Sequence, residues 1–253
     1  MRRGTLFVGV WLGLALVAAL VGGCREPRQD ESKAARSAAG SAEWRWLQDA
    51  RKQLDEQRGR LATQKDPREA ERLAREVEAR TAELNRRLVD FINANAAAAP
   101  GAPPDERQRA AIRMKSDEDI LLAREYIEKG GDYRRAIEIY ETALAADPDN
   151  PRLKRELEAT QARRYMTPRR FSQVKEGMTP DEVRRLLGSP NVQDVRSYPD
   201  RGVTAWFYPK DATGAAAAVW FQKKSAQTEV YLLDFEAIQP PAAAPPDAGP
   251  PPP

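Results

Sequence analysis

The sequence contains no histidine and a single cysteine among its 253 residues. Without histidine, neither a Ser-His-Asp nor a Cys-His nucleophile can form, and the commonest metal-binding side chain is missing. One cysteine permits no internal disulfide. No other set of residues combines a nucleophile, a base and an oxyanion donor. We therefore expect a protein that is not an enzyme, without metal, cofactor or small-molecule substrate.

Aromatic residues are also scarce, and neither sign of charge is in large excess. Aromatic types make up 7% of the chain, charged types make up 31%, and the formal net charge is only +3. Basic and acidic residues alternate along the whole length, without a basic stripe, so we expect no nucleic-acid partner. The low aromatic share favours helices and linkers over one large core.

The chain also lacks an apolar run of the roughly 20 residues that a membrane-spanning helix needs. The apolar run at 6–21 is shorter, follows Arg2 and Arg3, and leads to small residues before Cys24. This order is typical of a secretory signal. We expect residues 1–23 to be a signal peptide; a short uncleaved anchor helix is the alternative.

The stretch Leu20-Val21-Gly22-Gly23-Cys24 resembles the lipobox of bacterial lipoproteins. The resemblance implies cleavage before Cys24 and covalent lipid (palmitate-type acyl chains) on Cys24, which would hold the protein on membrane lipid at about 0.8 kcal/mol per buried CH₂. Arg25 stands where an Asp favours retention in the inner membrane. The expected location is therefore the cell envelope, with a lipid anchor on the periplasmic face of the outer membrane.

Two heptad runs follow a stretch that has almost no apolar residues. Residues 24–40 are small and charged, so we expect a flexible tether there. Leucines 47, 54 and 61 recur every seven residues, as do Val77, Leu84 and Phe91, and Asp66-Pro67 interrupts the helix between the runs. We expect an antiparallel, coiled-coil-like helical hairpin at 41–97. A spacer role is favoured over a specific binding face.

A Pro/Ala-rich linker and helix lead-in at 98–116 precedes a different helical pattern at 117–165. There, the spacing of Ala136, Tyr140, Ala143 and Pro148 resembles the second helix of a tetratricopeptide (TPR) repeat. Gly130-Gly131 would make the turn between the helices, and a helix from about residue 152 would cap the pair. Such repeats usually need about three copies to bury a continuous core. A protein-docking site and a purely structural hairpin both remain open.

Residues 166–239 contain two helix starts, at Thr167-Pro168 and Thr179-Pro180. Glu182 can close a capping box on Thr179. Gly188 would end the second helix in a left-handed conformation, and Pro190 prevents its continuation. Its expected apolar face consists of Val183, Leu186 and Leu187.

Three strands are expected next, at 203–208, 215–222 and 229–235, and the last of them has apolar residues on both faces. The fold class is therefore α+β. It comprises an N-terminal helical hairpin and TPR-like helices, followed by a small sandwich of two helices and a three-stranded antiparallel sheet.

The most specific pattern is the frame of Gly177, Met178, Thr179, Glu182, Leu187, Gly188 and Pro190, with Trp206 in the next strand. It resembles the SmpA/OmlA (BamE-like) family of envelope lipoproteins. Most members are small and have no preceding hairpin or repeat. The resemblance implies a non-catalytic domain that binds envelope proteins, with the β-barrel assembly machinery as the candidate partner.

Most residues of that frame have structural roles, which leaves Lys175, Arg184, Arg185 and Tyr208 as exposed candidates for partner binding. The expected function is therefore support of outer-membrane protein assembly or envelope integrity. The alternative is a structural adaptor lipoprotein of another envelope complex, for secretion, motility or the cell wall.

The segment 240–253 contains eight prolines among small residues. It cannot form a core and is expected to be extended or disordered. We favour a solubilising end over a polyproline ligand.

Overall fold

The structure is a computed structural model that describes residues 28–95, 103–224 and 227–240, with the backbone alone at 28–37. The chain divides into two compact units, Met1–Ala42 and Glu43–Pro253. The expected signal peptide, Cys24 and most of the proline-rich segment lie outside the described residues. In the described part, no helix is long and apolar enough to cross a membrane. The predicted α+β class is confirmed: helices are followed by an antiparallel sheet.

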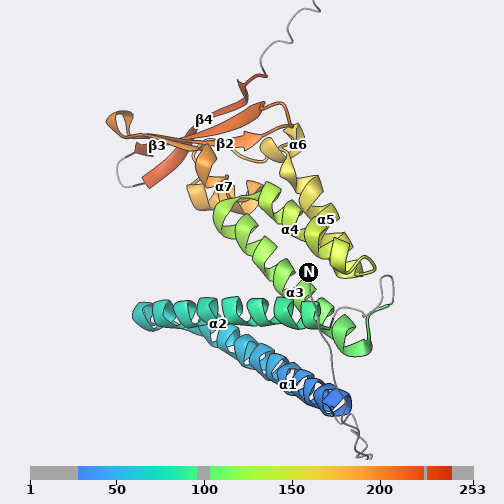
Figure 1. Cartoon of the computed structure of the whole chain (residues 1–253). Helices are drawn as coiled ribbons and strands as arrows, with labels where there is room; N and C mark the ends of the chain where they lie inside the picture. The colour runs from blue at the N-terminus through green and yellow to red at the C-terminus, as the bar shows by residue number, and fades with distance from the viewer. Residues whose placement is uncertain (1–27, 96–102, 225–226, 241–253) are drawn as a thin grey trace, which may run out of the picture. The chain divides into compact units, whose positions relative to one another are not determined.

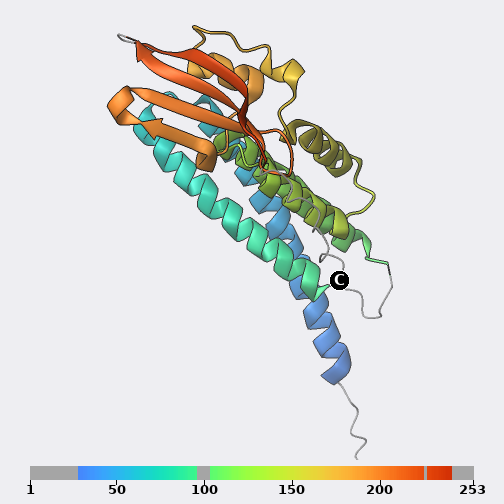
Figure 2. The same cartoon turned by 90° about the horizontal axis from the view of Figure 1, so that it is seen from above.

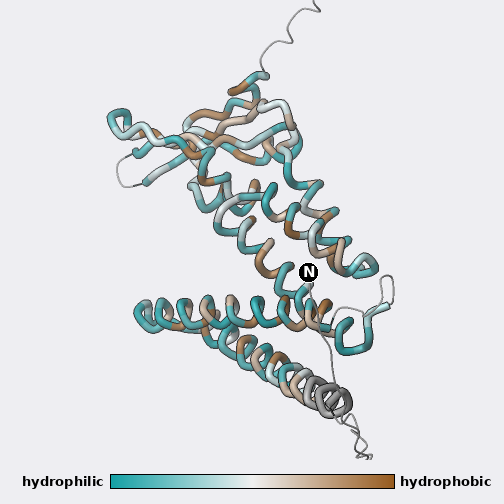
Figure 3. The backbone as a smooth tube through the Cα atoms, viewed as in Figure 1, coloured by the Kyte–Doolittle hydropathy of each residue, from teal (hydrophilic) through white to brown (hydrophobic). Residues whose placement is uncertain are grey.

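The first two helices are α1 (Arg28–Thr63) and α2 (Pro67–Ala94). Asp66 begins α2 because its carboxylate accepts from the backbone N–H groups of Arg68 and Glu69. Figure 3 shows both helices as mainly hydrophilic with separate hydrophobic positions. Those positions meet in a buried seam of Leu47, Leu54, Leu84, Leu88 and Phe91.

The predicted tether at 24–40 is wrong from Arg28 onward, because α1 begins at that residue. This stretch has no apolar periodicity, which is why it looked unstructured. It is nevertheless rich in alanine, lysine, arginine and glutamate, all strong helix formers. The helix propensity of these residues therefore extends α1 toward the N-terminus, beyond the start that the heptad periodicity predicts.

Three further helices follow: α3 (Glu106–Gly130), α4 (Tyr133–Ala146) and α5 (Pro151–Arg164). The turn between α3 and α4 depends on Gly131, whose φ of 60° lies in the left-handed region. The helix α3 begins at Glu106, within the segment 98–116 that was expected to be a linker and helix lead-in. Its Ala111 packs into the hairpin seam, whereas its Ile120 and Ala123 pack against α4 and α5. The helix α3 thus contributes side chains to two separate buried clusters.

The last part contains short helices and a sheet (Figure 1). The helices are α6 (Pro168–Phe171) and α7 (Pro180–Leu187), and the 3₁₀ turns are η1 (Val192–Asp194) and η2 (Pro199–Arg201). The strands are β1 (Val195–Tyr198), β2 (Val203–Pro209), β3 (Ala216–Lys224) and β4 (Gln227–Ile238). They pair in sequence order and antiparallel throughout. Figure 2 shows the same sheet from a second direction.

The expected three-stranded sheet is thus corrected to four strands. The sequence signal for β1 was missed because this strand has only four residues, three of them exposed, and is followed by Pro199. It pairs with β2 from Val195 opposite Trp206 to Tyr198 opposite Val203. A short, polar edge strand is a common way to end a sheet.

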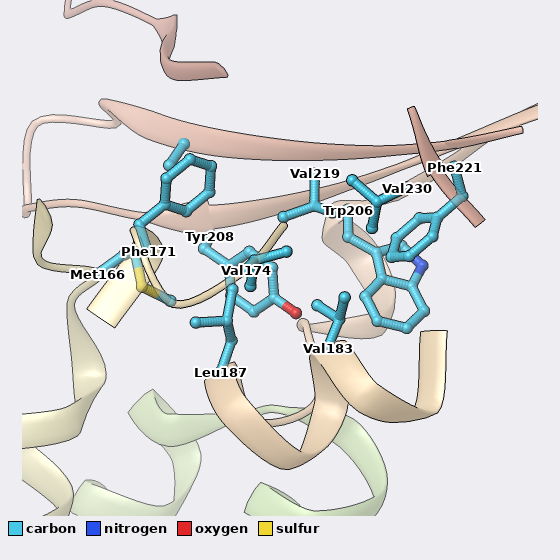
Figure 4. Close-up of a cluster of buried hydrophobic side chains, with 11 residues drawn as sticks. Met166, Phe171, Val174, Val183, Leu187, Trp206, Tyr208, Val219, Phe221 and Val230 are labelled. Carbon is cyan, nitrogen blue, oxygen red and sulfur yellow. The ribbon is translucent and has the colours of Figure 1, made fainter. Parts of the chain in front are cut away.

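The main core of this part lies between α6, α7 and the sheet. Figure 4 shows Val183 and Leu187 pointing from α7 toward Val219 and Trp206 of the sheet. The whole buried cluster comprises Met166, Phe171, Val174, Val183, Leu187, Trp206, Tyr208, Ala217, Val219, Phe221 and Val230.

Two expectations about apolar faces are wrong. Leu186 is not part of the core face of α7, since 38% of it is exposed. The strand β4 is not covered on both faces: Tyr231 and Leu232 are 39% and 44% exposed, and only Val230 is buried. As an edge strand, β4 has a neighbour on one side only, so its side chains lack the lateral cover that a second strand would give.

Candidate partner-binding surface

The helix α7 is fixed by reciprocal capping at its start. The Thr179 hydroxyl accepts from the backbone N–H of Glu182, and the Glu182 carboxylate accepts from the backbone N–H of Thr179 at 2.8 Å. These hydrogen bonds keep the pKa of Glu182 below its usual range. At the other end, Gly188 has φ 87° and ψ 173°. This conformation is open to glycine but is not the left-handed helical cap that we expected.

Arg184 is held in a defined position on the exposed side of α7. Its Nη1 lies 2.6 Å from Oδ1 of Asp181, one turn earlier. Its guanidinium carbon lies 4.8 Å from the centroid of the Trp206 ring, in cation–π geometry. An arginine that is already ordered loses less side-chain entropy when it binds a partner.

Arg185 and Lys175 are also exposed, but they belong to different elements. Arg185 follows Arg184 on α7, whereas Lys175 lies in the turn before that helix. This turn is bound to β4 by two hydrogen bonds of 2.8 Å: Gly177 donates to the Val230 carbonyl, and Val230 donates to the Met178 carbonyl. The turn and α7 therefore rest on the same sheet. We call Lys175, Arg184, Arg185 and the exposed Leu186 the α7 surface.

Tyr208 does not belong to this surface, which corrects our prediction of an exposed partner-binding residue. It is only 5% exposed, and its hydroxyl donates to the Gly188 carbonyl at 3.1 Å. Burial raises the pKa of this phenol well above its usual range. Strand alternation offered the missed signal, because Tyr208 shares a face with Trp206, which belongs to the frame of mostly structural residues.

The helices α3, α4 and α5, called the repeat here after the pattern that predicted them, are closed on their inner side. Tyr140, Ala136 and Ala123 are fully buried, and Ala143 is 4% exposed. Pro148 follows the end of α4 at Ala146. The outer side of α3 differs, because Leu122 and Tyr126 are 41% and 38% exposed. Four residues apart, they share one face of the helix, and sequence reasoning did not single them out.

A buried carboxylate connects the hairpin to the repeat. The Glu118 side chain on α3 is fully buried and lies 3.0 Å from Nη1 of Arg51 and 2.7 Å from Nη2 of Arg58. Both arginines belong to α1. Moving α1 away from α3 would leave this charge buried and unpaired, so the two ion pairs favour the observed packing of these helices.

The repeat also touches the sheet-bearing part. The Ser189 hydroxyl donates to the Glu128 carbonyl at 2.9 Å. A Cβ on Gly131 would lie 2.4 Å from the carbonyl carbon of Pro190, so glycine is required at this approach. Pro190, expected only to stop α7, therefore also packs against the repeat.

A polar cavity of 360 Å³ lies where the repeat meets the sheet-bearing part, and Arg134, Arg164, Arg170 and Tyr133 are among its lining residues. The guanidinium of Arg170 already has hydrogen-bond partners within the chain, because it donates to the carbonyls of Leu187 at 2.9 Å and Arg163 at 3.0 Å. Among the described residues, no three His, Cys, Asp or Glu side chains are placed to hold a metal ion.

Compared with models of protein families, with curated proteins and with solved structures, the chain shows no match. The SmpA/OmlA and tetratricopeptide resemblances stay predictions, carried by the residues quoted for them above.

Proposed function

We propose that the protein is a membrane-anchored periplasmic lipoprotein that supports outer-membrane protein assembly or envelope integrity through protein–protein contacts. The observation that carries this proposal is the α7 surface. Its helix is fixed on one side by Val183 and Leu187 in the core and presents Arg184, Arg185 and Leu186 on the other. Arginine beside an exposed apolar side chain is a typical interface composition, and it favours an acidic partner with an apolar centre.

The anchor in this proposal is lipid on Cys24, supported by the order of charged, apolar and small residues before it. Cys24→Ser is expected to leave a larger precursor without acyl chains. The measurement is incorporation of radiolabelled palmitate into the wild type and the variant. Label entering both proteins equally would refute the lipid anchor.

The partner is tested by cross-linking in native membranes and quantitative recovery of the bound proteins. Recovery of a β-barrel assembly protein with the wild type supports the proposal. Recovery of proteins of secretion, motility or cell-wall systems alone supports the adaptor role instead.

A specific observation favours that second candidate, the structural adaptor. Leu122 and Tyr126 expose an apolar pair on α3, the helix that the Glu118 ion pairs fix to the hairpin. In this role, Leu122→Ser with Tyr126→Ser would abolish capture of the partner. The same double change would leave capture intact if the α7 surface is the binding site.

A further inference from the structure

The four-stranded sheet has a second apolar face, opposite the one that α6 and α7 cover (Figure 1). Its buried floor is built from small residues and one ring: Ala205, Phe207, Ala216 and Ala218. Half-buried side chains stand around this floor: Tyr198, Trp220, Ala237 and Ile238. We call these eight residues, together with Arg196 and Leu232, the outer face. No helix of the described chain contributes to this cluster.

Register shows that the outer face is continuous across all four strands. Trp220 on β3 pairs with Ala205 on β2 and with Leu232 on β4. Ala205 in turn pairs with Arg196 on β1. Directly paired residues of an antiparallel sheet point to the same side, so these four side chains form one row from edge to edge.

Aromatic rings dominate the middle of this face. Trp220 stacks on Tyr198 with ring centroids 5.9 Å apart and meets Phe207 edge-on at 6.0 Å. The guanidinium carbon of Arg196 lies 5.1 Å from the centroid of Phe207. Alanines 205, 216 and 218 form the floor next to these rings and are at most 6% exposed, so Tyr198 and Trp220 provide the accessible aromatic surface. Half-buried rings above a floor of small side chains suit a polyproline II segment, whose pyrrolidine rings pack between aromatics.

The chain supplies such a segment directly after β4. Ile238 belongs to the outer face, and residues 240–253 contain eight prolines and a single charged residue, Asp247. At about 3.1 Å per residue, a polyproline II segment reaches roughly 28 Å from Ile238 to Asp247. Arg196 lies three strand spacings from β4, about 14 Å, and four residues along β3 from the partner of Ile238, about 13 Å, so the direct distance is about 19 Å. Asp247 can therefore reach Arg196 on β1, and their charges are complementary.

We propose that the proline-rich segment 240–253 docks on the outer face of its own sheet, with its prolines against Tyr198 and Trp220 and with Asp247 paired to Arg196. The segment shields the aromatic rings and Leu232 from solvent and from other proteins. Partner binding is then confined to surfaces elsewhere. This inference extends the proposed function and does not depend on it.

The test uses the full chain in its native membranes. A photoreactive benzoylphenylalanine replaces Ala244 in the proline-rich segment, and the cells are illuminated. The expected product has the size of one chain, and its digestion yields a peptide that joins the segment to β1 or β3. A product of two-chain size would identify a second copy as the occupant. Cross-links to other proteins only, or none, would likewise overturn the proposal.

Charge-swap variants test the ion pair. Arg196→Glu is expected to lower the internal cross-link yield roughly two- to fivefold, the range for an exposed ion pair. Asp247→Arg added to Arg196→Glu should restore the yield. Arg169→Glu, on α6 and so on the opposite side of the sheet, is the matched control and should leave the yield unchanged. The proposal would be contradicted if Arg196→Glu lowers the cross-link yield and the added Asp247→Arg does not restore it. Circular dichroism checks that each variant is folded.

Discussion

The helical part (α1–α5) and the sheet-bearing part (residues 166–239) use their surfaces in different ways. In the helical part, charged residues pair with one another along and between helices, and Glu118 takes this pairing into the interior. In the sheet-bearing part, a second aromatic cluster lies away from the main core, and Leu186, Tyr231 and Leu232 are exposed. The helical part also exposes Leu122 and Tyr126, but it has no such second aromatic cluster among the described residues. The first pattern is typical of a spacer with fixed geometry, and the second of a recognition module.

The largest effect is expected in the sheet-bearing part. Leu187 is 2% exposed in the main core, so Leu187→Asp loses apolar contacts and buries a carboxylate. We expect a loss of more than about 4 kcal/mol of unfolding free energy, enough to unfold a part of this size. Circular dichroism and thermal melting measure it. The control is Leu186→Asp on the exposed side of the same helix, which should cost less than about 0.5 kcal/mol. An equal loss of unfolding free energy in the two variants would contradict the assignment of Leu187 to the buried face of α7 and Leu186 to its exposed face.

The matching change in the helical part is Ala143→Glu. Ala143 faces α3 and is 4% exposed, so a glutamate there would either bury its charge or separate the helices. We expect a loss of about 3 kcal/mol, somewhat less than for Leu187→Asp because a long side chain can bend toward solvent. The exposed neighbour Ala145→Glu serves as the control. Unchanged melting of Ala143→Glu would remove the basis for the helical repeat.

Glu118 tests whether the helical part is really fixed by its ion pairs. Glu118→Gln keeps the shape of the side chain but removes the charge that faces Arg51 and Arg58. Because both arginines stay partly exposed, at 21% and 24%, we expect a moderate loss of about 2 kcal/mol. Glu125→Gln removes an exposed partner of Lys129 and should cost less than about 0.5 kcal/mol. Chemical denaturation of both variants measures the difference.

Sequence patterns of short range predicted the fold best. The heptad seam of Leu47, Leu54 and Leu84 and the capping box of Thr179 with Glu182 depend on residues within a few turns of each other, and the structure contains both. One missed feature depends on a distant partner. From the sequence alone, Glu118 is expected to be a solvated charge, because its partner Arg58 lies sixty residues earlier in the chain.

The candidate surface was predicted less completely. Three aromatics in succession, at 206–208, do not reveal which of them points inward, so Tyr208 was assigned to the wrong side. Leu186 was assigned to the core because it lies beside Leu187, yet an eight-residue helix offers only a narrow inward face. Lys175, Arg184 and Arg185 are exposed as expected.

The smallest effect on the fold, and the one that addresses function, is expected from Lys175→Glu combined with Arg184→Glu. Both side chains are exposed, and only Arg184 has an ion pair, with Asp181. Reversing them should change the unfolding free energy by less than about 1 kcal/mol. Capture of an acidic partner should fall severalfold through charge mismatch.

The control for this last variant carries an equal charge change elsewhere on the same part of the chain. Arg201 and Lys223 are exposed on η2 and β3, and neither belongs to the α7 surface. Quantitative pull-down from identical membranes compares Arg201→Glu with Lys223→Glu against the α7-surface variant. Because both double variants change the net charge equally, a loss confined to the α7-surface variant reflects the location of the charges. If both variants capture the partner as the wild type does, while Leu122→Ser with Tyr126→Ser does not, the binding site lies on α3 and the adaptor role is the correct one.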